Sequence, residues 1–248
     1  MRVAALYDIH GNLPALEAVL VDLPNQDVDA IVIGGDIVWG PMPAETLDLL
    51  RALHGDVRWV RGNADREVAA VDPEERDASG LDLVTRITHW TADALDSEQR
   101  AFLRALPLTT SIDVEDLGPV LFCHATPRSD EEIVTSLAPD DVVTEALAPA
   151  SEDVIVCGHT HAQFDRRVGT KRFVNAGSVG MPYENRPGAY WTLLGPGVNH
   201  MRTEYDLDDA ADRIRAGGAP EVEALIASLR EPPDQRAAAR QQEARAGR

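Results

Sequence analysis

The sequence predicts an α/β (α+β) protein, a four-layer αββα sandwich of two mixed sheets flanked by helices. Strand-like apolar runs alternate with helical patterns over the first sixty residues, which predicts parallel strands joined by right-handed crossovers. Closely spaced strand-like runs in the second half, with Gly169 at a turn, predict a meander. A chain of 248 residues is long enough to bury a substantial core, so general disorder is excluded.

Each element follows from a local pattern. Leucines at 13, 16, 20 and 23 recur at helical spacing after Asn12, a favourable N-cap, and a second helix is expected over 44–53. A capping-box pattern at Asp96 and Gln99 predicts a helix over the residues that follow. Strands are expected at 3–7, 30–33, 58–60, 120–123, 154–157, 163–168, 172–175, 190–194 and 200–205.

We expect a single domain over 1–230. Within it, 66–117 has a helical pattern and is interpreted as a cap-like insertion over the functional site. A last helix is predicted over 222–229. The residues 231–248 are rich in Pro, Ala, Arg and Gln, which predicts a flexible tail.

Charge and apolar patterning exclude several classes of protein. With 23 basic and 42 acidic side chains the formal charge is −19, and no basic stripe is present, so duplex nucleic acid is not an expected partner. No apolar run is long enough for a signal peptide core or a membrane helix. Cys123 and Cys157 do not form a disulfide framework. We expect a cytoplasmic protein without a membrane partner, and homo-oligomerisation is left open.

Metal-ligating residue types directly follow five of the predicted strands. In open α/β sheets the carboxyl ends of strands meet at one crevice, so we expect these side chains to converge. Residues two apart point the same way in extended backbone, and glycines at 11, 35, 62 and 158 allow sharp turns beside them. The residues are Asp8, His10, Asp36, Asn63, His124, His159 and His161.

Seven such ligands are too many for one tetrahedral ion and suit two ions if one carboxylate bridges them. Because the set contains no thiolate, a structural zinc or iron–sulfur site is disfavoured. Imidazole mixed with carboxylate fits two divalent ions of Mn, Fe, Ni, Co or Zn. Two such ions stabilise the attacking and leaving oxygens of an in-line displacement, and they offset the negative charge of the chain for an anionic substrate.

The order of these motifs resembles the calcineurin-like metallophosphoesterase superfamily. The similarity runs from residue 3 to about residue 194 and includes Gly-Asp at 35–36, Gly-Asn-x-Asp at 62–65 and Gly-His-Thr-His at 158–161. The sequences Asp-Ile-His-Gly-Asn at 8–12 and Asn-Ala-Gly-Ser-Val-Gly-Met-Pro at 175–182 further resemble its small prokaryotic branch, which is related to diadenosine tetraphosphatases. The αββα sandwich of that family agrees with the order of elements.

The resemblance implies a role for each predicted ligand. Asp36 would bridge two ions, and Asp36 and Asn63 would be the catalytic residues. A hydroxide between the ions would attack phosphorus in line, with Asn63 helping to hold the phosphate of a small phosphorylated substrate. The first ion would be held by Asp8, His10 and His161, and the second by Asn63, His124 and His159.

Ala64 departs from the family pattern, in which a histidine that assists the leaving oxygen often follows the Gly-Asn pair. Alanine cannot transfer a proton, and general acid assistance is typically worth about 10²–10⁴-fold. Substrates with good leaving groups are therefore favoured: phosphodiesters, nucleotide phosphoanhydrides or activated esters. Asp65 would orient that histidine in the family, so in this chain both a catalytic role and a role in a turn remain open for it.

Three further residues are candidates with open alternatives. Ser178, in a glycine-flanked turn, either donates to substrate or simply fits a tight turn. Arg186 is a candidate phosphate contact. Trp39 either walls the pocket or packs in the core.

Two other functions remain to be weighed. A catalytically weak metal-binding scaffold used for protein interaction is favoured by Ala64 but opposed by the complete ligand set, because a scaffold has no need for clustered charged side chains. A metallo-β-lactamase-like hydrolase would need a His-x-His-x-Asp-His cluster, which the sequence lacks.

Overall fold

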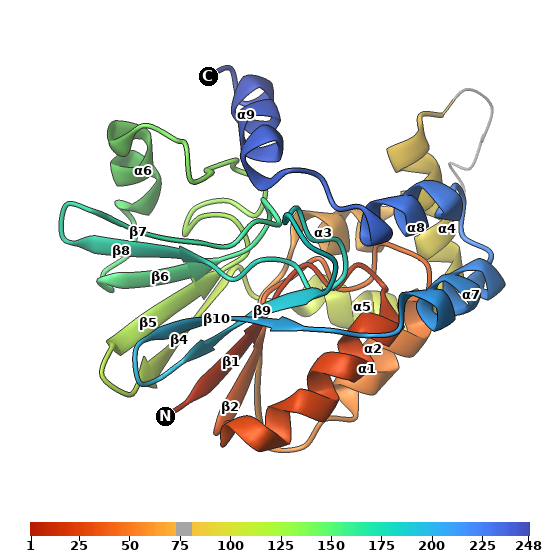
Figure 1. Ribbon diagram of the computed structural model, residues 1–248, viewed down its shortest axis with the longest axis horizontal. Coiled ribbons are helices and arrows are strands. Elements are labelled where there is room, and N and C mark those ends of the chain that lie inside the picture. Colours follow the sequence, from red (N-terminus) through yellow and green to blue (C-terminus); the bar gives the residue numbers. More distant parts are fainter. Residues whose placement is uncertain (73–80) are drawn as a thin grey trace.

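The computed structural model describes residues 1–72 and 81–248, and its described strands form two five-stranded mixed sheets (Figure 1). The strand order is β10-β9-β1-β2-β3 in the first sheet and β4-β5-β6-β8-β7 in the second. The strands are β1 (Val3–Leu6), β2 (Ala30–Ile33), β3 (Asp56–Trp59), β4 (Thr109–Val114), β5 (Gly118–Cys123), β6 (Val154–Cys157), β7 (Phe164–Val168), β8 (Lys171–Asn175), β9 (Ala189–Leu194) and β10 (Val198–Thr203).

Each sheet combines three neighbouring parallel strands with two strands that run antiparallel to their neighbours. In the first sheet β1, β2 and β3 are parallel, while β9 and β10 run antiparallel to their neighbours. In the second sheet β5, β6 and β8 are parallel, with β4 and β7 antiparallel at the edges. The parallel strands of each sheet therefore all deliver their carboxyl ends to one edge, as the β-α-β pattern predicts.

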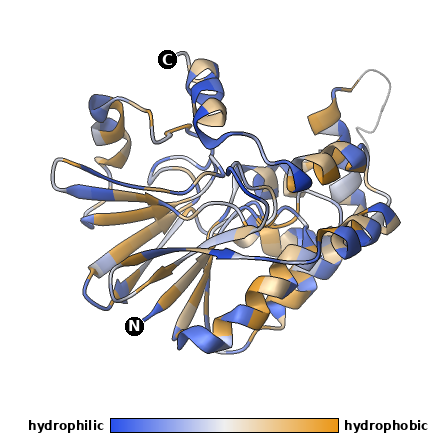
Figure 2. Cartoon of the chain, in the orientation of Figure 1, coloured by the Kyte–Doolittle hydropathy of each residue, from blue (hydrophilic) through white to orange (hydrophobic). Residues whose placement is uncertain are grey.

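The two sheets pack face to face through the alternating side chains of their strands. Val3, Ala5 and Tyr7 belong to a buried cluster that also contains side chains of β5, β6 and β8, whereas Ala4 and Leu6 face the helical side of the first sheet. The Tyr7 hydroxyl donates to the carbonyl of Val156 on β6 at 3.2 Å, so it links the sheets. Figure 2 shows hydrophobic residues along the strands of both sheets.

Helices cover the outer faces of both sheets, which completes the predicted four-layer sandwich (Figure 1). Side chains of α1 to α5 share one core cluster with the first sheet, while α6 packs on the second. The described helices are α1 (Leu13–Asp22), η1 (Leu23–Gln26, a 3₁₀ turn), α2 (Pro43–Arg51), α3 (Asn63–Ala70), α4 (Leu83–Ala94), α5 (Ser97–Ala105), α6 (Asp140–Leu147), α7 (Leu207–Gly217), α8 (Val222–Arg230) and α9 (Gln235–Arg245).

The segment 66–117, expected as a helical insertion, is only partly that. Helices α4 and α5 pack into the core of the first sheet, where Leu103 is fully buried, so they are part of the layer of helices on that sheet. Its last part forms β4, which pairs with β5 because residues 109–114 alternate polar and apolar. Residues 73–80 of the expected insertion lie outside the described residues.

The tail predicted to be flexible instead contains a helix, which corrects the interpretation of 231–248. Asp234 caps α9, and Ala238 and Ala239 of this helix are buried. The carboxylate of Glu243 accepts from both the backbone and the hydroxyl of Thr135. Composition missed this helix because it is held by polar contacts and small side chains rather than by an apolar face.

The structure also bears on the predictions made for the two cysteines and for membrane-spanning segments. Cys123 and Cys157 are buried free thiols. In the part of the chain that the structure describes, no helix has both the length and the apolar character needed to cross a bilayer.

Candidate metal centre

All seven predicted ligands lie just beyond the carboxyl ends of five parallel strands. The ends of β1, β2 and β3 belong to the first sheet and those of β5 and β6 to the second, so the group lies where the two sheets meet. In chain order the segments carry Asp8 and His10, Asp36, Asn63, His124, and His159 and His161.

The backbone at this edge is not extended. This corrects the expectation that Asp8 and His10, and likewise His159 and His161, point the same way because extended residues two apart do so. Positive φ angles of 51° to 63° occur at Asp8, His10, Asp36, His159 and His161. Non-glycine residues rarely adopt this left-handed region, and such strain gathers at functional sites that the surrounding fold holds in place. The side chains converge because the chain curls tightly after each strand.

Two of the neighbouring glycines are needed for close approach rather than for their own φ. A Cβ on Gly62 would lie 2.1 Å from Oδ1 of Asp36, and a Cβ on Gly158 would lie 2.4 Å from Oδ2 of Asp8. Any larger side chain at either position would displace a predicted ligand.

Four of the predicted ligands form a compact buried group. One ligand atom from each of Asp8, His10, Asp36 and His161 lies within 4.8 Å of the others. The Nε2 atoms of His10 and His161 are 3.1 Å apart, and Nε2 of His161 is 3.4 Å from Oδ1 of Asp8. Two buried imidazole nitrogens at this separation need a proton or a cation between them, because two lone pairs repel. This group could hold a metal ion.

Asp36 connects this group to the other predicted ligands. Its Oδ2 lies 3.7 Å from Nε2 of His10, while its Oδ1 lies 3.5 Å from Nε2 of His124. The rings of His124 and His159 are in edge contact, with centroids 5.2 Å apart. One carboxylate therefore faces both halves of the predicted ligand set.

Backbone carbonyls fix the tautomer of three histidines. The Nδ1 atoms of His10, His124 and His161 lie 2.8–3.0 Å from the carbonyl oxygens of Trp39, Gly34 and Met181, respectively. A carbonyl only accepts, so each Nδ1 carries a proton and each Nε2 is the ring atom that is left to bind a ligand. His159 is reversed: its Nε2 donates to the carbonyl of Glu131 at 3.1 Å, which leaves Nδ1 free.

Among the residues that the structure describes, three buried polar atoms of this site have no hydrogen-bond partner: Oδ1 of Asp8, Oδ1 of Asn63 and Nε2 of His124. Buried polar atoms are almost always paired in folded proteins, so each orphan needs an explanation. The Asn63 amide also hydrogen-bonds the Glu67 carboxylate one turn later on α3. That contact engages the amide nitrogen and leaves the oxygen as the orphan, as expected for a metal ligand. All three atoms therefore fit the divalent ions that the sequence predicts.

Burial and charge divide the histidines into two protonation classes. Burial, assisted by the neighbouring His161 for His10 and His124 for His159, lowers the pKa of both histidines to about 4. Burial also opposes charging of His124, but the adjacent Asp36 and Asp8 carboxylates outweigh it and raise its pKa to about 10. His10 and His159 are thus neutral at pH 7, whereas His124 gives up a proton when it binds a metal.

Two predicted substrate contacts take other positions. Ser178 is fully buried. Its hydroxyl donates to the carbonyl of Asp8 at 2.7 Å and accepts from the amide of Met181, so Ser178 positions the loop after β1 instead of facing a substrate. Arg186 is exposed and lines a separate surface pocket that contains none of the predicted ligands. The sequence does not show whether a serine in a glycine-flanked turn, or an arginine on the surface, faces the site or points away from it.

Asp65 has a structural role. Its carboxylate accepts from the amides of Ile37, at 2.8 Å, and Gly62, at 3.1 Å, and it is fully buried. These bonds tie the loop after β2 to the start of α3 and so fix Asp36 relative to Asn63. The amide of Ala64 donates to Oδ1 of Asp36 at 2.9 Å.

A salt-bridge network behind His159 was not predicted. Asp130, which is 6% exposed, accepts from Arg61 and Arg66 at 3.0 Å each, and Arg66 also pairs with Glu131. The carbonyl of Glu131 holds His159, so this network supports that ring. The only sequence signal was an acidic run after the β5 strand, which is indistinguishable from an ordinary solvated loop.

Comparison with known proteins agrees with this geometry. The model of the calcineurin-like phosphoesterase superfamily domain matches residues 1–194. An uncharacterized protein of Methanocaldococcus jannaschii, MJ0912, is 31% identical over 245 residues, covering 88% of this chain and 94% of that protein. Phosphodiesterase YfcE of Escherichia coli K12 is 28% identical over 203 residues, covering 78% of this chain and 87% of YfcE.

Structural similarity extends over nearly the whole chain. A metallophosphoesterase from Sphaerobacter thermophilus superposes with a TM-score of 0.72 at 27% identity, covering 92% of this chain and 98% of that one. The αββα architecture and the superfamily predicted from sequence are confirmed, while the diadenosine-tetraphosphatase-related subtype stays a prediction. The chain belongs to the calcineurin-like phosphoesterase superfamily, and it is a metal-dependent phosphoric ester hydrolase.

Proposed function

We propose that this chain uses two divalent metal ions to hydrolyse phosphodiesters, nucleotide phosphoanhydrides or activated phosphate esters of small molecules. Asp8, His10 and His161 would hold one ion, and Asn63, His124 and His159 the other. Asp36 would contact both. When bound, the two ions supply positive charge for the phosphate oxygens and acidify a water molecule for attack.

The observation that carries this proposal is the set of unpaired buried ligand atoms. Oδ1 of Asp8 belongs to the first half, and Oδ1 of Asn63 and Nε2 of His124 belong to the second. Leaving a buried polar atom without a hydrogen bond costs about 1–3 kcal/mol, and a divalent ion in each half would compensate this cost at all three atoms. One ion near Asp8 would leave the second pair uncompensated.

The residues beside the ions support substrates with good leaving groups. The amide of Ala64 donates to Asp36, but its methyl side chain has no proton to give, and the Asp65 carboxylate is engaged by two backbone amides. Neither residue can protonate a leaving oxygen. An alkyl monoester would therefore lack assistance that an aryl diester or an anhydride does not need.

Metal analysis combined with turnover of bis-p-nitrophenyl phosphate tests the proposal. We expect two ions per chain and hydrolysis, and we expect Asp36→Asn to lower kcat by about 10²–10³-fold, because charge stabilisation at the site is lost. Asp113→Asn, a change of the same kind at an exposed position of β4, is the matched control and should leave kcat unchanged.

A weak scaffold of the same fold is the alternative. Two bound ions without turnover of monoesters, diesters or dinucleoside polyphosphates would favour it. Asp36→Asn acting no more strongly than Asp113→Asn would also contradict the proposed role of Asp36.

A further inference from the structure

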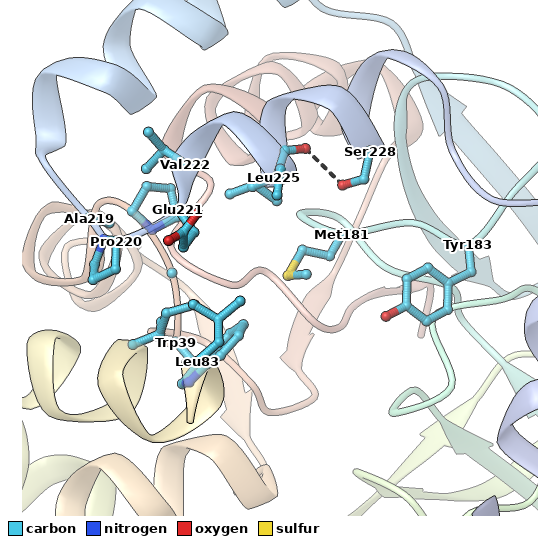
Figure 3. Close-up of a pocket in the computed structure, with 14 residues that line it drawn as sticks. Trp39, Leu83, Met181, Tyr183, Ala219, Pro220, Glu221, Val222, Leu225 and Ser228 are labelled. Carbon is cyan, nitrogen blue, oxygen red and sulfur yellow. Dashed lines mark hydrogen bonds between the residues drawn. The ribbon is translucent and has the colours of Figure 1, made fainter. Parts of the chain in front are cut away.

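The walls of an apolar pocket of about 280 Å³ include residues that contact His10 and His161 of the first half of the metal centre. The pocket is walled by the loop after β2, by α4, by α8 and by the loop that precedes β9. Figure 3 shows Trp39 and Leu83 on one side and Val222 and Leu225 on the other, with Met181 on the side toward Tyr183. Helices α4 and α8 therefore meet over one cavity.

Three of the wall residues touch the predicted metal ligands. The backbone carbonyl of Trp39 accepts a hydrogen bond from Nδ1 of His10. The Trp39 and His10 rings are in edge contact, with centroids 5.7 Å apart. The backbone carbonyl of Met181 accepts from Nδ1 of His161, and the centroids of the Tyr183 and His161 rings are 4.8 Å apart. A group in the pocket would be adjacent to a phosphate at the metal centre.

Several polar groups of the lining already have partners within the protein. The indole nitrogen of Trp39 donates to Thr88 at 3.0 Å, and the Ser228 hydroxyl donates to the Leu225 carbonyl at 2.7 Å. Glu221 lies 3.6 Å from Arg86 in an ion pair. Among the described residues that line the pocket, none is lysine or arginine. The lining is thus poorly suited to a second phosphate or a sugar and well suited to an apolar group.

Parts of this wall lie outside the region that the family model matches. The family model ends at residue 194, whereas the loop before α8 and α8 itself follow it at 219–230. The metal ligands all lie within the matched region. The pocket therefore combines residues of the matched domain with residues of the segment that follows it.

We propose that this pocket binds the apolar, ring-sized group attached to the reacting phosphate, which makes aryl-substituted phosphoesters the preferred substrate class. The inference rests on the proposed function, since it places the phosphate at the metal centre. A cavity of ~150 Å³ lined by apolar side chains already holds benzene, so this larger pocket has room for one ring and a substituent.

Binding of two phosphonates to the manganese-loaded protein tests the pocket without turnover. Phenylphosphonate and methylphosphonate carry the same anionic group and differ only in the apolar one. Calorimetry should give a Kd for phenylphosphonate about 10–100-fold lower, because only its ring removes apolar surface from water in the pocket. Equal Kd values would overturn the proposal.

A charged substitution at the pocket wall sharpens the test. Leu83 is the first residue of α4 and is 41% exposed, so Leu83→Asp places a carboxylate in the lining at a position where helices tolerate acids. It should reduce the phenyl preference at least 10-fold and leave the Kd of methylphosphonate unchanged. Val21→Asp, at a 73% exposed position on α1 outside the pocket, is the matched control and should keep the preference.

The outcomes separate the two proposals. Turnover of bis-p-nitrophenyl phosphate without a phenyl preference, or a preference that Leu83→Asp and Val21→Asp leave equally intact, would overturn the pocket assignment. A phenyl preference that is lost in Leu83→Asp, in a protein that hydrolyses no phosphoester, would instead overturn the proposed hydrolysis.

Discussion

The two halves of the metal centre are supported in different ways. In the first half, His10 and His161 are oriented by backbone carbonyls, and Asp8 is fully buried. In the second half, Asn63 lies on α3 and is oriented by Glu67, while His159 is oriented by the carbonyl of Glu131. Main-chain carbonyls thus orient the histidines of both halves, including His124 through Gly34, whereas only the second half also depends on side chains, namely Glu67 and the ion pairs behind the Glu131 loop.

This difference teaches which half is easier to disturb. Main-chain support changes little when a surface residue is replaced, whereas the Glu131 loop is held by the ion pairs of Arg61 and Arg66 with Asp130. Partners behind the ligands typically change metal affinity or activity by about 10–100-fold when they are replaced. Changes near the second half should therefore separate the affinities of the two ions.

The largest effect should come from removing a ligand of the first half. His10→Ala is expected to lower kcat on bis-p-nitrophenyl phosphate by about 10³-fold, because one ion contributes several kcal/mol to stabilising the reacting charges. His54→Ala removes a histidine that lies outside the cluster, in a different surface pocket, and should leave kcat unchanged. A small loss in His10→Ala would mean that the first half is dispensable.

A smaller and more selective effect is expected at Asp130. Asp130→Asn should weaken binding of the second manganese ion by about 10–100-fold and leave the first ion unchanged, because it releases the loop that holds His159. Electron paramagnetic resonance of a manganese titration distinguishes the two sites. The comparison would fail if both ions weakened equally, and Asp113→Asn is again the matched control.

The smallest effect concerns the loop that supports His161. Glu184 is buried and accepts from the amide of Gln163 at 2.6 Å, and burial raises its pKa to about 7 from an ordinary value of 4.5. Glu184 therefore holds its proton more tightly in the folded protein than in the unfolded chain. The stability that this proton contributes is complete below pH 4.5 and is lost as the pH rises through 7.

Glu184→Gln should therefore stabilise the protein more at pH 8.5 than at pH 5.5. The difference should be on the order of 1 kcal/mol, or ~2–4 °C in Tm, with no change in manganese affinity. Thermal unfolding at the two pH values checks the first part. A loss of manganese affinity would contradict the view that the first half is supported by the main chain.

The fold and the clustering of the predicted ligands at one edge of the sheets were accessible from sequence because both depend on local signals. Each predicted ligand follows an apolar strand, and the edge where parallel strands end is fixed by the connection rules. The conformations at the site were not accessible. Asp8 and His10 converge through positive φ angles, which their residue types do not announce.

Long-range packing explains what the sequence left out. Helix α9 is joined to the body by Glu243 and Thr135, more than a hundred residues apart, and the apolar pocket combines residues from Trp39 to Ser228. Leucines and valines at these positions look like any core residues. The role of Ser178 was likewise hidden, because its partner is a backbone carbonyl 170 positions away.

Diffraction from crystals grown with manganese, with an anomalous difference map, tests the central claim most directly. Two peaks are predicted, one among Asp8, His10 and His161 and one among Asn63, His124 and His159, with Asp36 contacting both. A single peak, or density in which Oδ1 of Asn63 and Nε2 of His124 contact no ion, would contradict a two-ion centre.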